Sequence, residues 1–314
     1  MKHYKIAFVG MGSIGKRHLN NVCQLITEKV ASCEIDLYRS KGNKELPEDV
    51  LSKVARQYSV DDEIDQTYDM VFITNPTSQH LVTAKKFLGY AKSFFIEKPV
   101  FDTTEVDIDV IKALDAIPSY IACPLRYNPV LQYVKSHVDL GKVISVRAIS
   151  SSYLPDWRPG QDYRKCYSAH RDMGGGVGID LIHEWDYLTY LFGMPTECQS
   201  IQTKISRLEI DSDDLAIYIA RNECLSFELH LDYFGRKTFR TLDILMEDET
   251  LHCDLIAGTV EYLQSESKLN FNGERDAFQM AEIRHYIDIA EGKIESDSTV
   301  EHGMKVLKLT KGIV

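Results

Sequence analysis

The chain has 314 residues, of which 44% are hydrophobic and 26% are charged, a composition typical of a globular protein long enough for two domains. Its formal net charge of −11 disfavours a general surface for nucleic acids or anionic membranes, because those partners need basic stripes, and we expect neither. Membrane-length apolar runs, a signal peptide, C-x-x-C pairs and zinc spacing are all missing, which favours a cytoplasmic protein with seven reduced cysteines and no metal site.

The first third of the chain alternates strand and helix patterns. Short apolar runs predict strands, and apolar residues at helical spacing predict the helices between them. The strands are predicted over residues 5–9, 34–38, 70–74, 94–96 and 120–123, and the helices over 13–30, 47–58, 79–90 and 104–116. Because parallel strands need such crossovers, this rhythm predicts a parallel, doubly wound α/β sheet.

The pattern changes near Cys123. One more helix is predicted over 128–138, and from residue 143 several runs alternate with period two, as half-buried antiparallel strands do. These strands are predicted over 143–153, 198–206, 215–221, 225–231, 239–246, 250–256 and 259–264. Helices are predicted over 179–192, 276–291 and 300–309. We therefore predict an α/β domain over residues 1–122 and an α+β domain over residues 123–314 that includes the C-terminal helices.

A glycine-rich turn follows the first predicted strand. The segment GMGSIG is a G-x-G-x-x-G motif that opens a helix, which is the context in which this motif binds dinucleotides. The first glycine permits a tight turn, the second lets the backbone approach a pyrophosphate at the helix N-terminus, and the third lets helix and strand pack closely. The predicted cofactor contacts are Gly10, Gly12, Ser13, Ile14 and Gly15. The alternative is a glycine-rich turn without a ligand.

The end of the second predicted strand distinguishes NADP(H) from NAD(H). NAD enzymes place an acidic residue there to hold the ribose 2′-hydroxyl, but Asp36 lies inside the strand, too early for its tip. The tip carries Arg39, Ser40 and Lys41, which suit a 2′-phosphate because a guanidinium pairs well with phosphate. We therefore predict NADP(H) in preference to NAD(H), with a solvated basic loop as the alternative.

A charged pair ends the buried strand at 94–96. Glu97-Lys98-Pro99 lies at the strand edge where an open α/β sheet binds its ligand, and the proline keeps Lys98 extended. Beside a nicotinamide ring, Lys98 would stabilise alkoxide character and help pass the proton that accompanies the hydride. A surface salt bridge is the alternative. The cofactor contacts predicted at this edge are Thr74, Asn75, Pro76, His80, Glu97 and Lys98.

Several segments, in their order and spacing, resemble one family. They are FVGMGSIGKRHLNN, ITNPTSQH and FIEKPV, followed by PLRYNPVLQYVK and GGGVGIDLIHEWDYLTYLFG. They are similar to the glucose–fructose oxidoreductase, inositol dehydrogenase and rhizopine-catabolism family (Gfo/Idh/MocA), over essentially the whole chain. The resemblance implies a Rossmann domain and a substrate domain with an open-faced, mostly antiparallel mixed sheet that joins a homodimer or homotetramer. It also implies NAD(P)-dependent hydride transfer to or from a sugar, cyclitol or related polyol.

The resemblance also assigns catalytic residues. In the family the lysine of Glu-Lys-Pro is catalytic, here Lys98, and a helix presents an aspartate and a histidine with D-x-x-x-H spacing. This chain has Asp180 and His183, one residue closer, and an i,i+3 pair still shares a helix face. We predict that His183 is the proton partner, since imidazole titrates near neutral pH, and that Asp180 orients the substrate or the imidazole. The alternative is a capping aspartate and a packed histidine.

A loop rich in aromatic and basic residues precedes the glycine run. Its aromatic rings suit stacking on a sugar, and its arginines suit clamping a carboxylate or phosphate. With two residues near the predicted interdomain bridge, the substrate-binding candidates are Arg126, Tyr127, Trp157, Arg158, Tyr163 and Arg164. The arginines favour an acidic sugar or a nucleotide-sugar derivative, with solvated surface arginines as the alternative.

Two other classes of function remain open at this point. One is a non-catalytic sensor that binds the dinucleotide and a partner protein, which Lys98 and His183 disfavour. The other is a lyase or glycosidase that uses tightly held NAD for transient oxidation. Arg39 disfavours this second class, because it favours an exchangeable NADP.

Overall fold

The chain folds into two compact units. The computed structural model describes residues 2–40, 42, 45–273 and 275–314, so the prediction for Lys41 lies outside the described residues. Unit 1 comprises Met1–Pro124 and Gln279–Met304, and unit 2 comprises Leu125–Phe278 and Lys305–Val314. The sequence analysis placed all C-terminal helices in the second domain. In the structure Gln279–Met304 instead belongs to unit 1, because Tyr286 and its neighbours pack into that unit's core.

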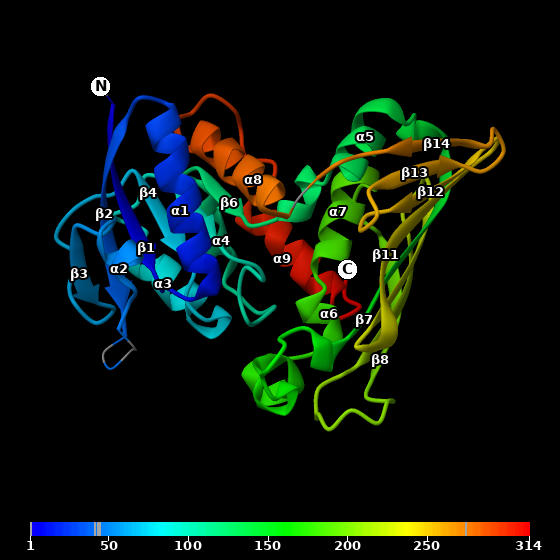
Figure 1. The fold of residues 1–314 in the computed structure, drawn as a ribbon, viewed down its shortest axis with the longest axis horizontal. Helices are drawn as coiled ribbons and strands as arrows, with labels where there is room; N and C mark the ends of the chain where they lie inside the picture. The colour runs from blue at the N-terminus through cyan, green and yellow to red at the C-terminus, as the bar shows by residue number, and fades with distance from the viewer. Residues whose placement is uncertain (1, 41, 43–44, 274) are drawn as a thin grey trace. The chain divides into compact units, whose positions relative to one another are not determined.

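Unit 1 is built on a six-stranded sheet (Figure 1). The strands lie in the order β3-β2-β1-β4-β5-β6, and all neighbours pair in parallel. They are β1 (His3–Val9), β2 (Ser32–Arg39), β3 (Arg56–Ser59), β4 (Met70–Ile73), β5 (Phe94–Ile96) and β6 (Ser119–Ile121). The predicted doubly wound sheet is confirmed. Its strand order reverses between β1 and β4, which is where such sheets bind ligands at their carboxyl edge.

The helices that connect these strands agree with the predictions except at one place. They are α1 (Ser13–Glu28), α2 (Glu48–Leu51), α3 (His80–Phe87) and α4 (Ile108–Asp115), and unit 1 also includes parts of α8 (Arg275–Ala290) and α9 (Val300–Leu309). The helix predicted over 47–58 is wrong, because it contains only the short α2 and is followed by β3. Tyr58 packs as a strand residue, stacked on Tyr38 of β2 at 4.9 Å. Pairing with the edge of β2 therefore overrides the helical spacing.

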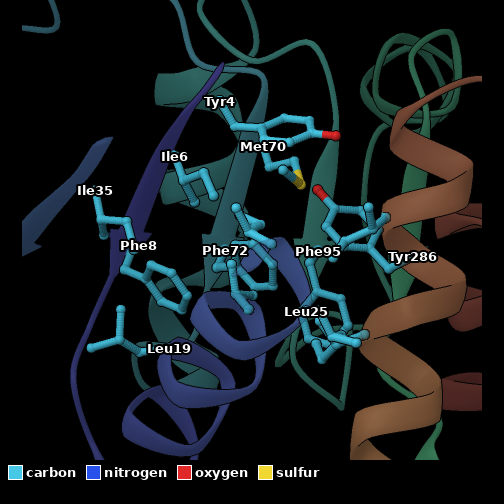
Figure 2. Packing of buried hydrophobic residues seen from close by; sticks show 14 of the residues in the cluster. Tyr4, Ile6, Phe8, Leu19, Leu25, Ile35, Met70, Phe72, Phe95 and Tyr286 are labelled. Carbon is cyan, nitrogen blue, oxygen red and sulfur yellow. The ribbon is translucent and has the colours of Figure 1, made fainter. Parts of the chain in front are cut away.

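The core on one face of this sheet fixes the position of α1. Figure 2 shows Leu25 of α1 and Tyr286 of α8 among the aromatic side chains of the strands. Phe8 and Phe72 stack at 4.6 Å, and Tyr286 lies edge-on to Phe72 and to Phe95 at 5.3 Å. Burial of each such side chain stabilises the fold by about 1.5–3 kcal/mol. The N-terminus of α1 is thereby held at the carboxyl edge of β1.

Unit 2 is built on an eight-stranded mixed sheet in the order β14-β13-β12-β11-β7-β10-β9-β8. All neighbours pair antiparallel except β7 and β10, which are parallel. The strands are β7 (Val143–Tyr153), β8 (Glu197–Thr203), β9 (Leu215–Arg221), β10 (Ser226–Asp232), β11 (Phe234–Met246), β12 (Thr250–Asp254), β13 (Thr259–Tyr262) and β14 (Ser267–Asn270). Only β14 was not predicted, because its residues are all exposed and give no apolar alternation.

One face of this sheet is covered by helices. They are α5 (Pro129–His137), α6 (Val177–Asp180) and α7 (His183–Phe192). Trp185 of α7 lies edge-on to Tyr218 of β9 at 5.4 Å and is fully buried. Ile201 and Ile219 on β8 and β9 are 63% and 65% exposed. The predicted mostly antiparallel mixed sheet is thus confirmed. Among the described residues, no helix has the length and apolarity needed to cross a membrane.

Candidate active site

The glycine turn between β1 and α1 packs against the end of β4. Gly10 has a φ of +92°, which side chains rarely adopt, and a Cβ there would lie 2.6 Å from the backbone of Asn75. A Cβ at Gly15 would lie 2.8 Å from Oγ1 of Thr74, and this hydroxyl donates to Gly10 O at 3.0 Å. No described atom lies within 4 Å of a Cβ built on Gly12. The first and third glycines therefore permit close packing, and the second borders open space.

Helix α1 begins at this turn without a side-chain cap. Gly12 is its N-cap residue, and the first turn of the helix contains no acidic residue. The first N–H groups of a helix have no partner within the helix, and they carry the positive end of its dipole. The backbone around Ser13 and Ile14 thus has the geometry and charge that suit a pyrophosphate, and the glycine cradle fits a dinucleotide.

A cavity of about 400 Å³ lies beyond the carboxyl ends of β2 and β3. Its lining residues are Arg39, Ser40, Gly42, Gln57, Tyr58, Ser59 and Asp62. Asp36 is buried in β2, and its carboxylate accepts hydrogen bonds from Arg56 Nε at 3.1 Å and from the Tyr68 hydroxyl at 2.9 Å. Asp36 is therefore occupied within the fold. Arg39 and Ser40 line the cavity at the strand tip.

The Glu97-Lys98 pair leaves the sheet at the same edge. Glu97 N–H donates to Ile73 O of β4 at 3.0 Å, which places the pair beside the end of β4. The Glu97 side chain is only 13% exposed; its Oε1 lies 2.5 Å from His18 Nε2, and its Oε2 accepts the Lys98 N–H at 3.2 Å. Burial raises the pKa of Glu97, but the hydrogen bond with His18 and the charges of His18, Lys98 and His80 outweigh burial and lower it. Glu97 is thus ionised at neutral pH.

His80 connects the loops that follow β4 and β5. It is buried, its Nε2 lies 3.0 Å from Asn75 O, and its Nδ1 lies 3.0 Å from Pro99 O and 3.2 Å from Val100 O. Burial lowers the pKa of His80, although the carbonyl groups and Glu97 act in the opposite direction. The structure therefore brings together the residues predicted at this edge, which are Thr74, Asn75, Pro76, His80, Glu97 and Lys98.

The helix predicted over 179–192 is broken, which corrects the reasoning about its two site residues. α6 ends at Asp180 and α7 begins at His183, so the two residues do not share one helix face. α6 packs closely on the sheet, since a Cβ on Gly178 would lie 2.6 Å from the Tyr218 hydroxyl. This packing and the contacts of Asp180 set α6 apart from α7. His183 lies half-buried at the start of α7.

Asp180 is buried and is held by tyrosine hydroxyls. The Tyr233 hydroxyl donates to Asp180 Oδ2 at 2.5 Å, and Tyr167 also hydrogen-bonds to this carboxylate. Burial, together with the charge and hydrogen bond of Asp180, raises the pKa of Tyr233 well above its ordinary value. Tyr233 is therefore a protonated donor at neutral pH. The sequence analysis did not name Tyr233 or Tyr167 as site residues: Tyr167 lies in the aromatic and basic loop that it singled out, whereas Tyr233 belongs to no recognisable motif.

Two of the substrate candidates lie beside this carboxylate network. Trp157 packs edge-on to Tyr233 at 5.2 Å, and its Nε1 donates to Ser152 Oγ at 2.9 Å. The Arg158 guanidinium lies 5.4 Å from the ring centre of Tyr167. The structure thus joins Trp157 and Arg158 to Asp180 through the two tyrosines.

The other substrate candidates lie in different settings. Arg126 is buried and forms a bidentate ion pair with Asp186, in which Nε lies 2.9 Å from Oδ2 and Nη2 lies 2.6 Å from Oδ1. Arg164 pairs with Asp162 at 2.8 Å and with Glu209 at 3.2 Å. The Tyr163 hydroxyl accepts the Glu209 N–H at 3.2 Å, and Tyr127 ends a short 3₁₀ segment. Both arginines thus already have carboxylate partners.

The described residues contain no arrangement of side chains that would bind a metal ion. Among them, no group of three or more histidine, cysteine, aspartate or glutamate side chains is placed to hold an ion. The predicted catalytic residues lie in both units, with Lys98 after the end of β5 in unit 1, and Asp180 and His183 at the end of α6 and the start of α7 in unit 2.

Comparison with known proteins places the N-terminal part of the chain in one family. Residues 4–116 match GFO_IDH_MocA, described as "Oxidoreductase family, NAD-binding Rossmann fold". D-xylose dehydrogenase of Paenarthrobacter nicotinovorans is 26% identical over 145 residues, which are 45% of this chain and 37% of that protein. Inositol 2-dehydrogenase of Rhizobium meliloti (strain 1021) is 26% identical over 132 residues, 40% of this chain and 37% of that protein. The chain thus matches little more than a third of the length of these relatives.

Solved structures share the fold over the whole chain. Levoglucosan dehydrogenase in complex with NADH and levoglucosan superposes with a TM-score of 0.82 at 16% identity, covering 99% of this chain and 96% of that chain. The WlbA dehydrogenase from Bordetella pertussis in complex with NADH and UDP-GlcNAcA superposes with a TM-score of 0.79 at 18% identity, covering 99% and 95%. The sequence match agrees with the glycine turn and the Glu97-Lys98 edge, since residues 4–116 match the Gfo/Idh/MocA oxidoreductase family and its NAD-binding Rossmann fold, and the solved structures share the fold of the whole chain.

Proposed function

We propose that this protein is an NAD(P)-dependent oxidoreductase that transfers a hydride to or from the hydroxyl or carbonyl carbon of a sugar, cyclitol or sugar derivative. One observation carries the proposal. The Glu97-Lys98 pair leaves β5 at the carboxyl edge of the parallel sheet, where it is tied to the glycine turn through α1 and through the end of β4. A lysine ammonium at this edge would act on a substrate oxygen.

The geometry of unit 1 supports the proposed mode of cofactor binding. The turn from Gly10 to Gly15 and the N-terminus of α1 would hold the pyrophosphate, and Arg39 and Ser40 would hold a 2′-phosphate. We propose NADP(H) in preference to NAD(H), because the carboxylate of Asp36 is occupied by Arg56 and Tyr68. When bound, the nicotinamide would accept or supply the hydride.

Protein side chains would take up or supply the proton that accompanies the hydride. In the oxidation direction the hydroxyl proton of the substrate would leave as its carbon loses a hydride, and Lys98 would stabilise the developing negative charge on that oxygen. We propose His183 as the group that takes up this proton. Asp180, fixed by the Tyr233 hydroxyl, would orient the substrate or the imidazole.

The substrate class is supported by the relatives and by unit 2. The relatives named D-xylose dehydrogenase and inositol 2-dehydrogenase support a sugar or a cyclitol. Trp157 would stack on the ring of such a substrate, and Arg158 favours an acidic or nucleotide-linked sugar.

The assembly is a further part of the proposal. We propose a cytoplasmic homodimer or homotetramer that forms through the open face of the unit 2 sheet. The exposed side chains of Ile201 and Ile219 on adjacent strands support an apolar contact there.

The proposal is tested by cofactor titration followed by turnover. Purified protein is titrated with NADPH and NADH by fluorescence and then assayed with a panel of sugars, sugar acids and cyclitols. We expect NADPH to bind, at least one polyol to be turned over, and Lys98→Met to abolish turnover while NADPH still binds. Near-normal turnover by Lys98→Met would remove Lys98 from the mechanism. Failure to bind either nucleotide would refute the proposal as a whole.

A further inference from the structure

We propose that His18 is a positioning residue, which holds the backbone of Lys98 in place through the carboxylate of Glu97. The inference rests on the proposed function, in which Lys98 acts on the substrate. His18 lies on α1, the helix that begins at the glycine turn, whereas Glu97 and Lys98 follow β5. The contact between them would thus connect the phosphate-binding helix with the catalytic lysine.

The contact is short, and its histidine is buried. His18 is completely buried, and its ring lies edge-on to Phe95 of β5 at 4.9 Å. Its Nε2 lies 2.5 Å from Oε1 of Glu97, and Oε2 of Glu97 accepts the backbone N–H of Lys98 at 3.2 Å. Each carboxylate oxygen therefore has one partner, and the two partners belong to α1 and to Lys98 itself.

The second ring nitrogen of His18 indicates that packing alone does not explain a histidine at this position. Nδ1 of His18 is buried and has no hydrogen-bond partner among the described residues. A leucine would fill much the same space without a buried, unpaired polar atom, which is unfavourable. The feature that a leucine cannot supply is the Nε2 contact with Glu97.

The segment after Lys98 is held by a different kind of contact. The ring of His80 binds the carbonyl oxygens of Pro99 and Val100, which do not titrate. The backbone is thus fixed on both sides of Lys98. Only the contact on the side of Glu97 depends on the charge of a carboxylate.

The charge of Glu97 in turn depends on His18. The ionisable groups that face this carboxylate are His18 from α1, His80 from α3 and the adjacent Lys98. Burial acts to raise the pKa of Glu97, and the hydrogen bond with His18 is the largest influence that lowers it. Without His18, the effect of burial on the pKa of Glu97 would be opposed less strongly, so this pKa would rise and Glu97 would become protonated at a higher pH.

The test uses His18→Leu, which removes the donor, and His18→Gln, which keeps an N–H donor at a similar position. The matched control is His252→Leu, which removes the imidazole–carboxylate pair with Asp243 in unit 2, at 2.6 Å. For each protein kcat, KM, the dissociation constant for NADPH and the melting temperature are measured. The titration of Glu97 is followed by infrared spectroscopy of its carboxyl band, with Glu97→Gln used to assign that band.

We expect His18→Leu to lower kcat about a hundredfold, as a displacement of about 1 Å does, with NADPH affinity within about twofold. The Glu97 band should titrate at higher pH, and His18→Gln should recover most of kcat. Normal kcat in His18→Leu, or an unmoved Glu97 titration, would overturn the inference. If His18→Leu does not fold, Glu97→Gln decides: loss of kcat at an unchanged melting temperature supports the inference, and normal kcat overturns it.

The failure of this inference can be told apart from failure of the proposed function. If the wild-type protein turns over no polyol, the proposed function fails, and the infrared titration still reports whether His18 controls the charge of Glu97. If the wild type is active and Lys98→Met is inactive, the proposed function stands. If His18→Leu then has the same kcat as the wild type, the positioning role of His18 is refuted and the proposed function is not.

Discussion

Replacement of Arg39 by alanine should weaken NADPH binding selectively. Arg39 and Ser40 line the cavity of about 400 Å³ beyond β2, and the buried Asp36 is occupied by Arg56. A hydrogen bond to a charged group contributes about 1.5–3 kcal/mol, and each 1.4 kcal/mol is tenfold in affinity. We therefore expect the dissociation constant for NADPH to rise about 10- to 150-fold, while that for NADH changes by less than about threefold.

The assay for Arg39→Ala is a parallel fluorescence titration with NADPH and NADH at low and high salt. A contact between a guanidinium and a phosphate is screened by salt, so the difference between wild type and variant should shrink as the salt concentration rises. Lys53→Ala is a suitable control, since Lys53 binds Asn20 at 2.8 Å and does not line the cavity. Equal weakening of both nucleotides, or no change for NADPH, would refute the assignment of Arg39 to the 2′-phosphate.

Two further predictions concern unit 2. Arg126→Leu leaves the carboxylate of Asp186 buried without its ion-pair partner, so we expect a loss of about 3–5 kcal/mol in the free energy of unfolding. The double variant with Asp186→Leu should recover most of this loss in urea unfolding; no recovery would argue against a paired charge. Burial raises the pKa of Asp214, but Ser206 and Lys204, the latter at 3.1 Å, help lower it below its ordinary value. This carboxylate therefore stabilises the fold above the unfolded pKa of about 3.9, and the contribution is lost as pH falls below it. Asp214→Asn should be less stable than wild type at pH 7, with a difference that narrows below about pH 4, and a constant difference across pH would contradict this.

The local features of unit 1 could be predicted from the sequence because they depend on neighbours in the chain. A glycine turn directly after an apolar strand, and a Glu-Lys-Pro directly after another, define both their conformation and their place at the carboxyl edge. The parallel sheet of unit 1 and the mostly antiparallel strands of unit 2 follow from the same kind of hydrophobic periodicity, whereas the mixed character of the second sheet was implied by the family resemblance. β3 was missed, since its strand conformation depends on pairing with the edge of β2.

The partners of buried polar groups could not be predicted in this way. His18 stood in a recognised segment, but its contact with Glu97 joins residues 79 positions apart in the chain. The contact of Asp180 with Tyr233 spans 53 positions, and it accompanies the break between α6 and α7 that no local pattern indicated. Hydrogen bonds and burial among distant residues are decided when the chain packs.

The sequence by itself thus determined the two sheet types, the glycine turn and the place of Lys98 at a strand end, because hydrophobic period and turn chemistry are local properties. Only the tertiary structure decided which groups form hydrogen bonds with the Lys98 backbone and with Asp180. It also decided that Arg126 forms an ion pair with Asp186 and that α8 packs mainly with unit 1. The physical reason is that a buried charge or polar group must find a partner wherever the fold provides one, and that partner is rarely a neighbour in sequence.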